Sequence, residues 1–196
     1  MTPLLAQTNY PKHNFTLGAG AGLPGGELGG SFADSAGVTA SYGYRFHRYF
    51  QADFGLDAVF GAARVRDFLS TDVGYLRIHD IQYFLPFGGR VVLPIGGGRV
   101  LASLGGGGAY LRYSERLRQP SSYYRVDCPS CTSRSGWGNY GLAGASMALD
   151  RYQRFRVGLT AKVYRAHTDG EPLGAIPATR TLDRWVNLFA DFTIGF

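Results

Sequence analysis

Residues 185–196, WVNLFADFTIGF, decide the fold of this chain. Every even-numbered residue in this stretch is apolar, whereas the odd-numbered residues include Asn187, Asp191 and Thr193. Successive side chains of a β-strand point to opposite sides, so the stretch predicts a strand with one wholly apolar face and one mixed face. Whether the apolar face meets a protein interior or lipid decides the class of protein.

The composition of the chain favours β-structure throughout. Its 196 residues include 29 Gly, 13 Tyr and 13 Phe, but only 2 Met and 2 Trp. Glycine disfavours helices, and aromatic residues favour pleated surfaces. No change in composition divides the chain, so we expect residues 1–196 to form a single domain.

The charge pattern narrows the function classes. The net charge is +6 and the isoelectric point is near 9.5, but the arginines are scattered singly, without a basic block or an RNA-binding motif, so we expect no nucleic-acid partner. No stretch approaches the roughly 20 apolar residues of a membrane helix.

The N-terminus shows a trace of an export signal. Ala6 before Gln7 resembles a cleavage site, so we expect residues 1–11 to be a signal-peptide remnant or an N-terminal tail.

Alternation of apolar and polar residues predicts eight strands joined by connections that are long and short in turn. The expected strands cover residues 14–22, 37–46, 50–60, 79–95, 100–114, 137–149, 154–166 and 185–196. The short reversals are residues 47–49, 96–99 and 150–153. In the fourth and fifth strands, Pro86 and the four glycines at 105–108 blur the alternation, because Gly-rich strands specify register poorly and Pro often marks a bulge.

Two architectures fit this pattern, a soluble β-protein and a membrane barrel. A soluble sandwich or lipocalin-like barrel would turn the apolar faces inward and expose the mixed faces to water. With 14 acidic residues in all, several of them in loops, those mixed faces carry too little charge for a soluble surface, of which about a quarter or more is usually charged. Small residues instead suit the narrow interior of eight strands. Lipid cannot form hydrogen bonds with the unpaired backbone N–H and C=O groups of an open strand edge, so a sheet in a membrane has to close. We therefore predict an all-β, closed, eight-stranded antiparallel transmembrane barrel with short periplasmic turns and long extracellular loops.

The chain resembles the small bacterial outer-membrane barrels, the group of the OmpA membrane domain, OmpX and OmpW. The pattern of strands carries this resemblance over the whole chain, and the last strand sharpens it. In that family such a strand is the assembly signal read by the barrel-assembly machinery, which here implies Leu188, Phe192, Ile194 and Phe196 as the signal. The resemblance also implies a bacterial outer-membrane location, with outer-membrane lipid and lipopolysaccharide as partners.

Charged residues on the predicted inward faces form a candidate lumen network. Its members, from different strands and of both signs, are Arg45, Asp53, Asp57, Arg90, Arg156, Lys162 and Asp191. Buried charge is costly unless it is paired, so we expect these side chains to pair and fill the lumen. The alternative is a narrow polar path for ions or small solutes.

Cys128 and Cys131 lie in the longest predicted loop, in the sequence CPSC. In an exported protein we expect a structural disulfide between them, whereas a redox pair or half of a zinc site are the alternatives. Zinc would need two further ligands, and the four His residues are scattered along the chain. We therefore expect no metal and no cofactor.

The most direct functional prediction is a non-enzymatic barrel with a structural or interaction role. Its extracellular loops, notably the Tyr- and Arg-rich residues 121–131, would meet lipopolysaccharide, a surface layer or another protein. An OmpW-like channel for small or hydrophobic solutes is the first alternative. A lipid A-modifying enzyme is the second, with His167, Asp169 and Glu171 near a strand end, although Thr168 and Asp169 replace the Ser of the deacylase-like arrangement.

Overall fold

The chain folds into a closed antiparallel barrel. The computed structural model describes residues 10–63, 68–72, 74–119, 125–173 and 176–196. Within them the strands are β1 (His13–Gly26), β2 (Ser35–His47), β3 (Phe50–Phe60), β4 (Phe68–Thr71), β5 (Gly74–Ile95), β6 (Val100–Leu117), β7 (Ser133–Ala148), β8 (Phe155–Gly170) and β9 (Thr181–Gly195). The two helices of the described residues, η1 (Glu27–Gly30) and η2 (Gly96–Gly98), are short 3-10 turns, and no helix there is long and apolar enough to cross a membrane.

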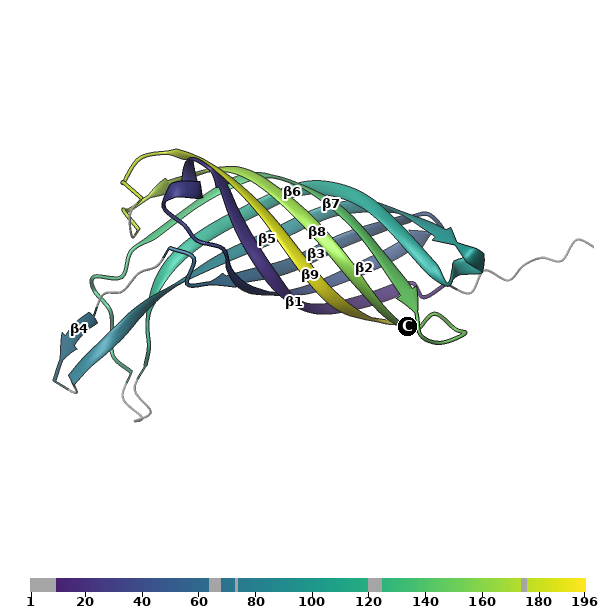
Figure 1. Ribbon diagram of the computed structural model, residues 1–196, viewed down its shortest axis with the longest axis horizontal. Helices are drawn as coiled ribbons and strands as arrows, with labels where there is room; N and C mark the ends of the chain where they lie inside the picture. The colour runs from purple at the N-terminus through teal and green to yellow at the C-terminus, as the bar shows by residue number, and fades with distance from the viewer. Residues whose placement is uncertain (1–9, 64–67, 73, 120–124, 174–175) are drawn as a thin grey trace, which may run out of the picture.

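Strand pairing closes the sheet into eight strands. The order is β3, β2, β1, β9, β8, β7, β6, β5, and β5 pairs again with β3 (Figure 1). The short β4 pairs with the outer part of β5 as an addition to the wall. The predicted eight-stranded antiparallel barrel is therefore confirmed.

The apolar faces of the strands lie on the outside of the barrel. In β9, the outward Leu188, Phe192 and Ile194 are 40–45% exposed, whereas the inward Asn187 and Phe189 are at most 2% exposed. The same alternation runs through the other barrel strands. The soluble barrel with its apolar face inward is therefore excluded by the observed orientation.

The two ends of the barrel differ in their connections. We call the end with the turns β2–β3, β5–β6 and β7–β8 the short-turn end, and the opposite end the loop end. At the loop end the strands run further than predicted: β7 begins at Ser133, β8 ends at Gly170 and β9 begins at Thr181. The predicted boundaries were wrong there because outward residues such as Arg165 and Arg184 break the apolar alternation while the backbone pairing continues.

β5 and β6 form the longest hairpin, of 22 and 18 residues. With β4, which lies in a stretch predicted as loop, this hairpin projects from the loop end (Figure 1). We call the part outside the barrel, Phe68–Thr71 with residues 74–80 of β5 and 115–117 of β6, the projecting hairpin. Pro86 interrupts the β3–β5 ladder between the Phe54–Phe87 and Asp57–Phe84 pairs, and the register is the same on both sides of this gap.

The glycine run at 105–108 lets β5 and β6 approach closely without ending either strand. Gly88 lies opposite Gly107, and a Cβ on Gly107 would lie 2.2 Å from the Phe87 carbonyl oxygen. Gly105 lies opposite Arg90, and Gly108 lies beneath the Phe87 ring. Because glycine has no side chain, this run makes room for the Arg90 side chain inside the barrel and for the Phe87 ring outside it.

Candidate functional site: a divided lumen

The barrel interior is divided into an apolar half and a polar half. The half toward the loop end is filled by buried apolar side chains that we call the loop-end core. Its members are Phe32, Val59, Ala62, Ala63, Ile78, Phe84, Ala109, Leu111, Tyr113, Leu117, Tyr140, Leu142, Tyr164, Ala166, Leu173, Ile176 and Trp185. The half toward the short-turn end is lined by polar and charged side chains.

Aromatic rings from different strands fill the centre of the loop-end core. The Trp185 indole Nε1 donates a hydrogen bond to the Tyr113 hydroxyl at 2.9 Å. The Phe84 ring packs against Trp185 and Tyr164, with centroid distances of 5.3 and 4.8 Å. Because all four side chains are fully buried, they occupy the cross-section of the barrel at this level.

Loop residues cover the loop-end core from above. Leu173 and Ile176, in the β8–β9 connection, are at most 2% exposed, and their backbones exchange two hydrogen bonds of 3.0 Å. Phe32, from the β1–β2 connection, packs edge-on against Trp185 at 5.3 Å. The described loops therefore continue the core beyond the barrel wall.

Arg134 fastens the β8–β9 connection to the wall. This fully buried side chain donates hydrogen bonds to the backbone oxygens of Thr168, Pro177 and Thr179 and to the hydroxyls of Thr168 and Thr181. Each donor of the planar guanidinium has a fixed direction, which suits such a convergence of acceptors.

Asp183 extends this network at the loop end, beyond the apolar part of β9. Its carboxylate accepts hydrogen bonds from the Thr168 and Thr181 hydroxyls at 2.5 and 2.6 Å. Burial raises the pKa of the Asp183 carboxyl, because desolvation disfavours its charged form, while these two hydroxyls act in the opposite direction.

Asp57 is the centre of a fully buried polar cluster below the loop-end core. Its carboxylate pairs with the Lys162 ammonium at 2.6 Å and accepts from the hydroxyls of Thr39 and Tyr164, each at 2.7 Å. The Asn187 amide donates from 3.4 Å. The partners lie on β2, β8 and β9, so this cluster ties strands across the lumen.

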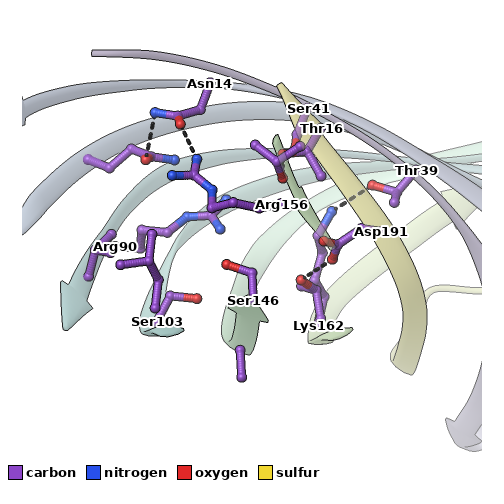
Figure 2. Close-up of a pocket in the computed structure, with 16 residues that line it drawn as sticks. Asn14, Thr16, Thr39, Ser41, Arg90, Ser103, Ser146, Arg156, Lys162 and Asp191 are labelled. Atoms are coloured by element: carbon purple, nitrogen blue, oxygen red, sulfur yellow. Dashed lines mark hydrogen bonds between the residues drawn. The ribbon is translucent and has the colours of Figure 1, made fainter. Parts of the chain in front are cut away.

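A second chain of polar contacts runs toward the short-turn end. Arg90 pairs with Asp53 at 2.6 Å, and the Gln51 amide donates to the other Asp53 oxygen at 2.7 Å. The Asn14 amide donates to Gln51. The Asn14 oxygen accepts from Arg156, as Figure 2 shows. This chain crosses from β5 through β3 and β1 to β8.

A polar cavity of about 60 Å³ lies among these side chains. Asn14, Arg90, Ser103, Ser146, Arg156 and Asp191 are among the residues that line it (Figure 2). Asp191 accepts a hydrogen bond from the Thr160 hydroxyl at 2.6 Å, and one buried Arg156 nitrogen, Nη1, has no protein partner. Such a space holds a few water molecules.

The structure places all seven residues of the predicted lumen network on the inner side of the wall. Four of them form the two ion pairs, and Arg156 and Asp191 bond to neutral groups beside the cavity. Arg45 lies apart, over the Tyr10 ring at 4.8 Å, and donates to the Arg48 carbonyl. The neutral members Asn14, Gln51, Thr39 and Asn187 were missed, although their inward positions in the alternation could have identified them.

Arg134 and Asp183 were also missed. They lie outside the strands expected from the alternation, in the extensions of β7 and β9 at the loop end. No inward direction was therefore assigned to them.

The predicted disulfide between Cys128 and Cys131 is present, with Cα atoms 5.4 Å apart. The pair packs against the loop-end core. Among the described residues no cluster of metal-ligating side chains occurs. Residues 120–124 of the Tyr- and Arg-rich loop, and residues 1–9 of the predicted N-terminal tail, lie outside the described residues.

The residues of the enzyme alternative do not assemble in a pocket. His167, Asp169 and Glu171 are exposed at the loop end of β8, and Glu171 accepts a hydrogen bond from the Ser133 backbone nitrogen. In the described part of the chain, no hydroxyl hydrogen-bonds to the His167 ring. A nucleophile activated by this His is therefore missing from the described geometry.

Leu188, Phe192, Ile194 and Phe196, the predicted assembly signal, all point outward. Phe196 follows β9, stacks on the His13 ring at 5.5 Å and exchanges two backbone hydrogen bonds of 2.9 Å with His13. The outward faces are thus available as the prediction requires. Reading by an assembly machinery stays a prediction.

Comparison with known proteins adds structural relatives. No protein-family model and no curated protein sequence matches the chain. Among solved structures, Neisserial surface protein A (NspA) superimposes with a TM-score of 0.60 at 14% identity, over 94% of this chain and 97% of the other. The outer membrane protein OprG from Pseudomonas aeruginosa gives 0.52 at 12% identity, over 95% and 97%. At these identities the likeness concerns the fold, and this chain has the eight-stranded barrel fold of these small bacterial surface and outer-membrane proteins.

Proposed function

We propose that this chain is a closed, non-conducting barrel of a bacterial outer membrane that presents an interaction surface outside the cell. The membrane location is supported by the apolar outer wall, since monomeric soluble proteins rarely expose large apolar patches. Large exposed outward side chains occur on every barrel strand, including Leu17, Val38, Phe54, Leu93, Leu104, Met147, Leu159 and Phe192. With the short-turn end in the periplasm, the loops and the projecting hairpin face outward.

The single observation that carries the non-conducting role is the loop-end core. Its buried rings fill the barrel from wall to wall, and Leu173 and Ile176 cover them. The polar cavity beneath reaches Thr39 and Lys162, which belong to the Asp57 cluster below this core. An OmpW-like channel would need an opening at this level.

The projecting hairpin supports the interaction role. Tyr75 and Phe68 are 79% and 62% exposed, and Arg116 of this hairpin lies at 5.5 Å over the ring of Tyr83 in the adjoining barrel wall. Aromatic residues and arginine are enriched in the energetically important parts of protein interfaces. His167→Ala with analysis of lipid A tests the enzyme alternative: an altered lipid A profile would favour it.

Planar-bilayer recording tests the closed lumen. The wild-type barrel should give no conductance steps, whereas a variant with Phe84→Ala and Trp185→Ala should conduct, because it truncates two rings that fill the cross-section. Trp137→Ala is the matched control, since that ring lies on the outer wall and is 66% exposed. Regular steps from the wild type would refute the proposal in favour of a channel.

Cysteine labelling on intact cells tests the orientation. Tyr75→Cys on the projecting hairpin should react with a membrane-impermeant maleimide. Tyr152→Cys, at the short-turn end and 74% exposed, should react only after the cells are opened. Both native cysteines are in a disulfide and do not compete. The reverse labelling pattern would refute the orientation.

A further inference from the structure

We propose that Arg165 and Arg184 form a binding site for the phosphate groups of an anionic outer-leaflet lipid. The site is on the outer wall of the barrel, at the loop end. This inference rests on the outer-membrane location of the proposed function and adds a specific lipid contact to it.

The two arginines face each other across the β8–β9 ladder. Arg165 and Arg184 are directly paired in the register, and both are exposed and outward. The next outward pair toward the membrane is Val163 with Val186, where the apolar wall begins. The guanidinium groups therefore lie at the edge of the apolar band, at the level where lipid headgroups meet acyl chains.

The neighbours on both sides leave this pair accessible. Arg165 is paired on its other side with the exposed Asn139 of β7, whose amide can add a hydrogen bond to an anion. Arg184 is paired with Gly25 of β1, which has no side chain to cover it. The surface is thus a short basic row bordered by an amide and a glycine.

The charge of this row is not balanced within the described protein. Like charges directly opposite each other in a sheet are destabilising. The ion pairs of the described residues join other side chains, and neither Arg165 nor Arg184 has a carboxylate within 4 Å there. Asp183 bonds inward to Thr168 and Thr181, and the Glu27 carboxylate accepts from the Leu182 backbone nitrogen.

A phosphorylated lipid fits both parts of this surface, the basic row and the apolar wall below it. Two guanidinium groups on neighbouring strands can bind phosphate oxygens in a forked geometry that lysine cannot reproduce. The acyl chains of the same molecule would lie over Val163, Val186 and Leu188. Free phosphate would meet the charges but would leave the apolar wall below unused.

The test measures lipid binding to the folded barrel in nonionic detergent by native mass spectrometry. The probe is bisphosphorylated lipid A, titrated against the wild type, a variant with Arg165→Gln and Arg184→Gln, and a control variant with Arg151→Gln and Arg154→Gln. The control removes two exposed arginines at the short-turn end. A heat-dependent shift on SDS gels verifies that each variant is folded.

We expect the wild type and the control to bind one lipid A, and the Arg165/Arg184 variant to bind at least tenfold more weakly. Equal binding by the folded Arg165/Arg184 variant would overturn the site. Displacement of lipid A by millimolar inorganic phosphate would overturn the lipid as occupant. A conducting lumen would refute the proposed function but would not change this readout, so the two failures are distinguishable.

Discussion

The buried Asp57–Lys162 pair yields the most quantitative prediction. Asp57→Asn keeps the shape of the side chain but removes its charge, so the buried Lys162 ammonium is left with neutral partners such as the Thr39 hydroxyl at 3.1 Å. Breaking a buried pair from one side costs about 3–5 kcal/mol because an uncompensated charge stays buried. We expect Asp57→Asn to lower the free energy of unfolding by about that amount.

The reverse substitution should cost less. In Lys162→Met the Asp57 carboxylate keeps three donors, from Thr39, Tyr164 and Asn187. Hydrogen bonds to a charged group are worth about 1.5–3 kcal/mol each, so this charge remains solvated by the protein. We expect a loss of about 2–3 kcal/mol for Lys162→Met, and of only about 1–2 kcal/mol for the double variant, in which no unpaired charge is buried.

Urea-induced unfolding in lipid vesicles, followed by the fluorescence of the two tryptophans, measures all four corners of this double-mutant cycle. The expected coupling energy is about 5 kcal/mol, because the two single losses together exceed the loss of the double variant by about that amount. Asp191→Asn is the matched control, because its partly exposed carboxylate holds one described hydroxyl, and it should cost about 1 kcal/mol. Losses that simply add in the double variant would refute the view that Asp57 and Lys162 are buried charges that need each other.

Three further predictions test other parts of the structure. Trp185→Ala should lower the free energy of unfolding by about 3–5 kcal/mol, measured by circular dichroism in urea, because it leaves a void in the loop-end core and removes the donor to Tyr113. Arg134→Gln should speed trypsin cleavage after the exposed Arg180 at least tenfold, since it releases the β8–β9 connection. Gly107→Ala should abolish the folded band on unboiled gels, because its Cβ would meet backbone of β5, whereas Gly141→Ala, with open space around the Cβ, should fold normally.

Each of these predictions has a clear contrary result. Stability of Trp185→Ala within about 1 kcal/mol of the wild type would mean that the loop-end core contributes little packing energy. An unchanged cleavage rate at Arg180 would mean that Arg134 does not hold the connection. Equal folding of both glycine variants would contradict the close approach of β5 and β6.

Period-two alternation predicted the fold wherever the barrel has lipid on one side and polar groups on the other. For β3 it gave both boundaries, residues 50 and 60, and for β9 it gave the correct faces. The same alternation identified the inward charges, because seven charged residues on alternating positions of different strands have to share one interior. The identity of each partner depends on register between strands, which a single sequence does not contain.

The prediction failed at the loop end because polarity there is inverted. Along β9, Val186 is outward and apolar, but the next outward residue is Arg184, while the inward Trp185 belongs to the loop-end core. An aromatic residue inside the barrel is indistinguishable in sequence from one facing lipid. The apolar seal of the lumen, which carries the proposed function, was therefore not visible from the chain alone.

The unequal lengths of the strands set how far the protein reaches from the membrane. At about 3.3 Å per residue and a tilt of about 40°, the 22 residues of β5 span roughly 55 Å along the barrel axis, whereas the apolar band of such barrels is roughly 25 Å tall. About 30 Å of paired strand is left above the acyl chains. A macromolecule too large to enter the layer of headgroups and sugars around the barrel could therefore still touch Phe68 and Tyr75 at its tip.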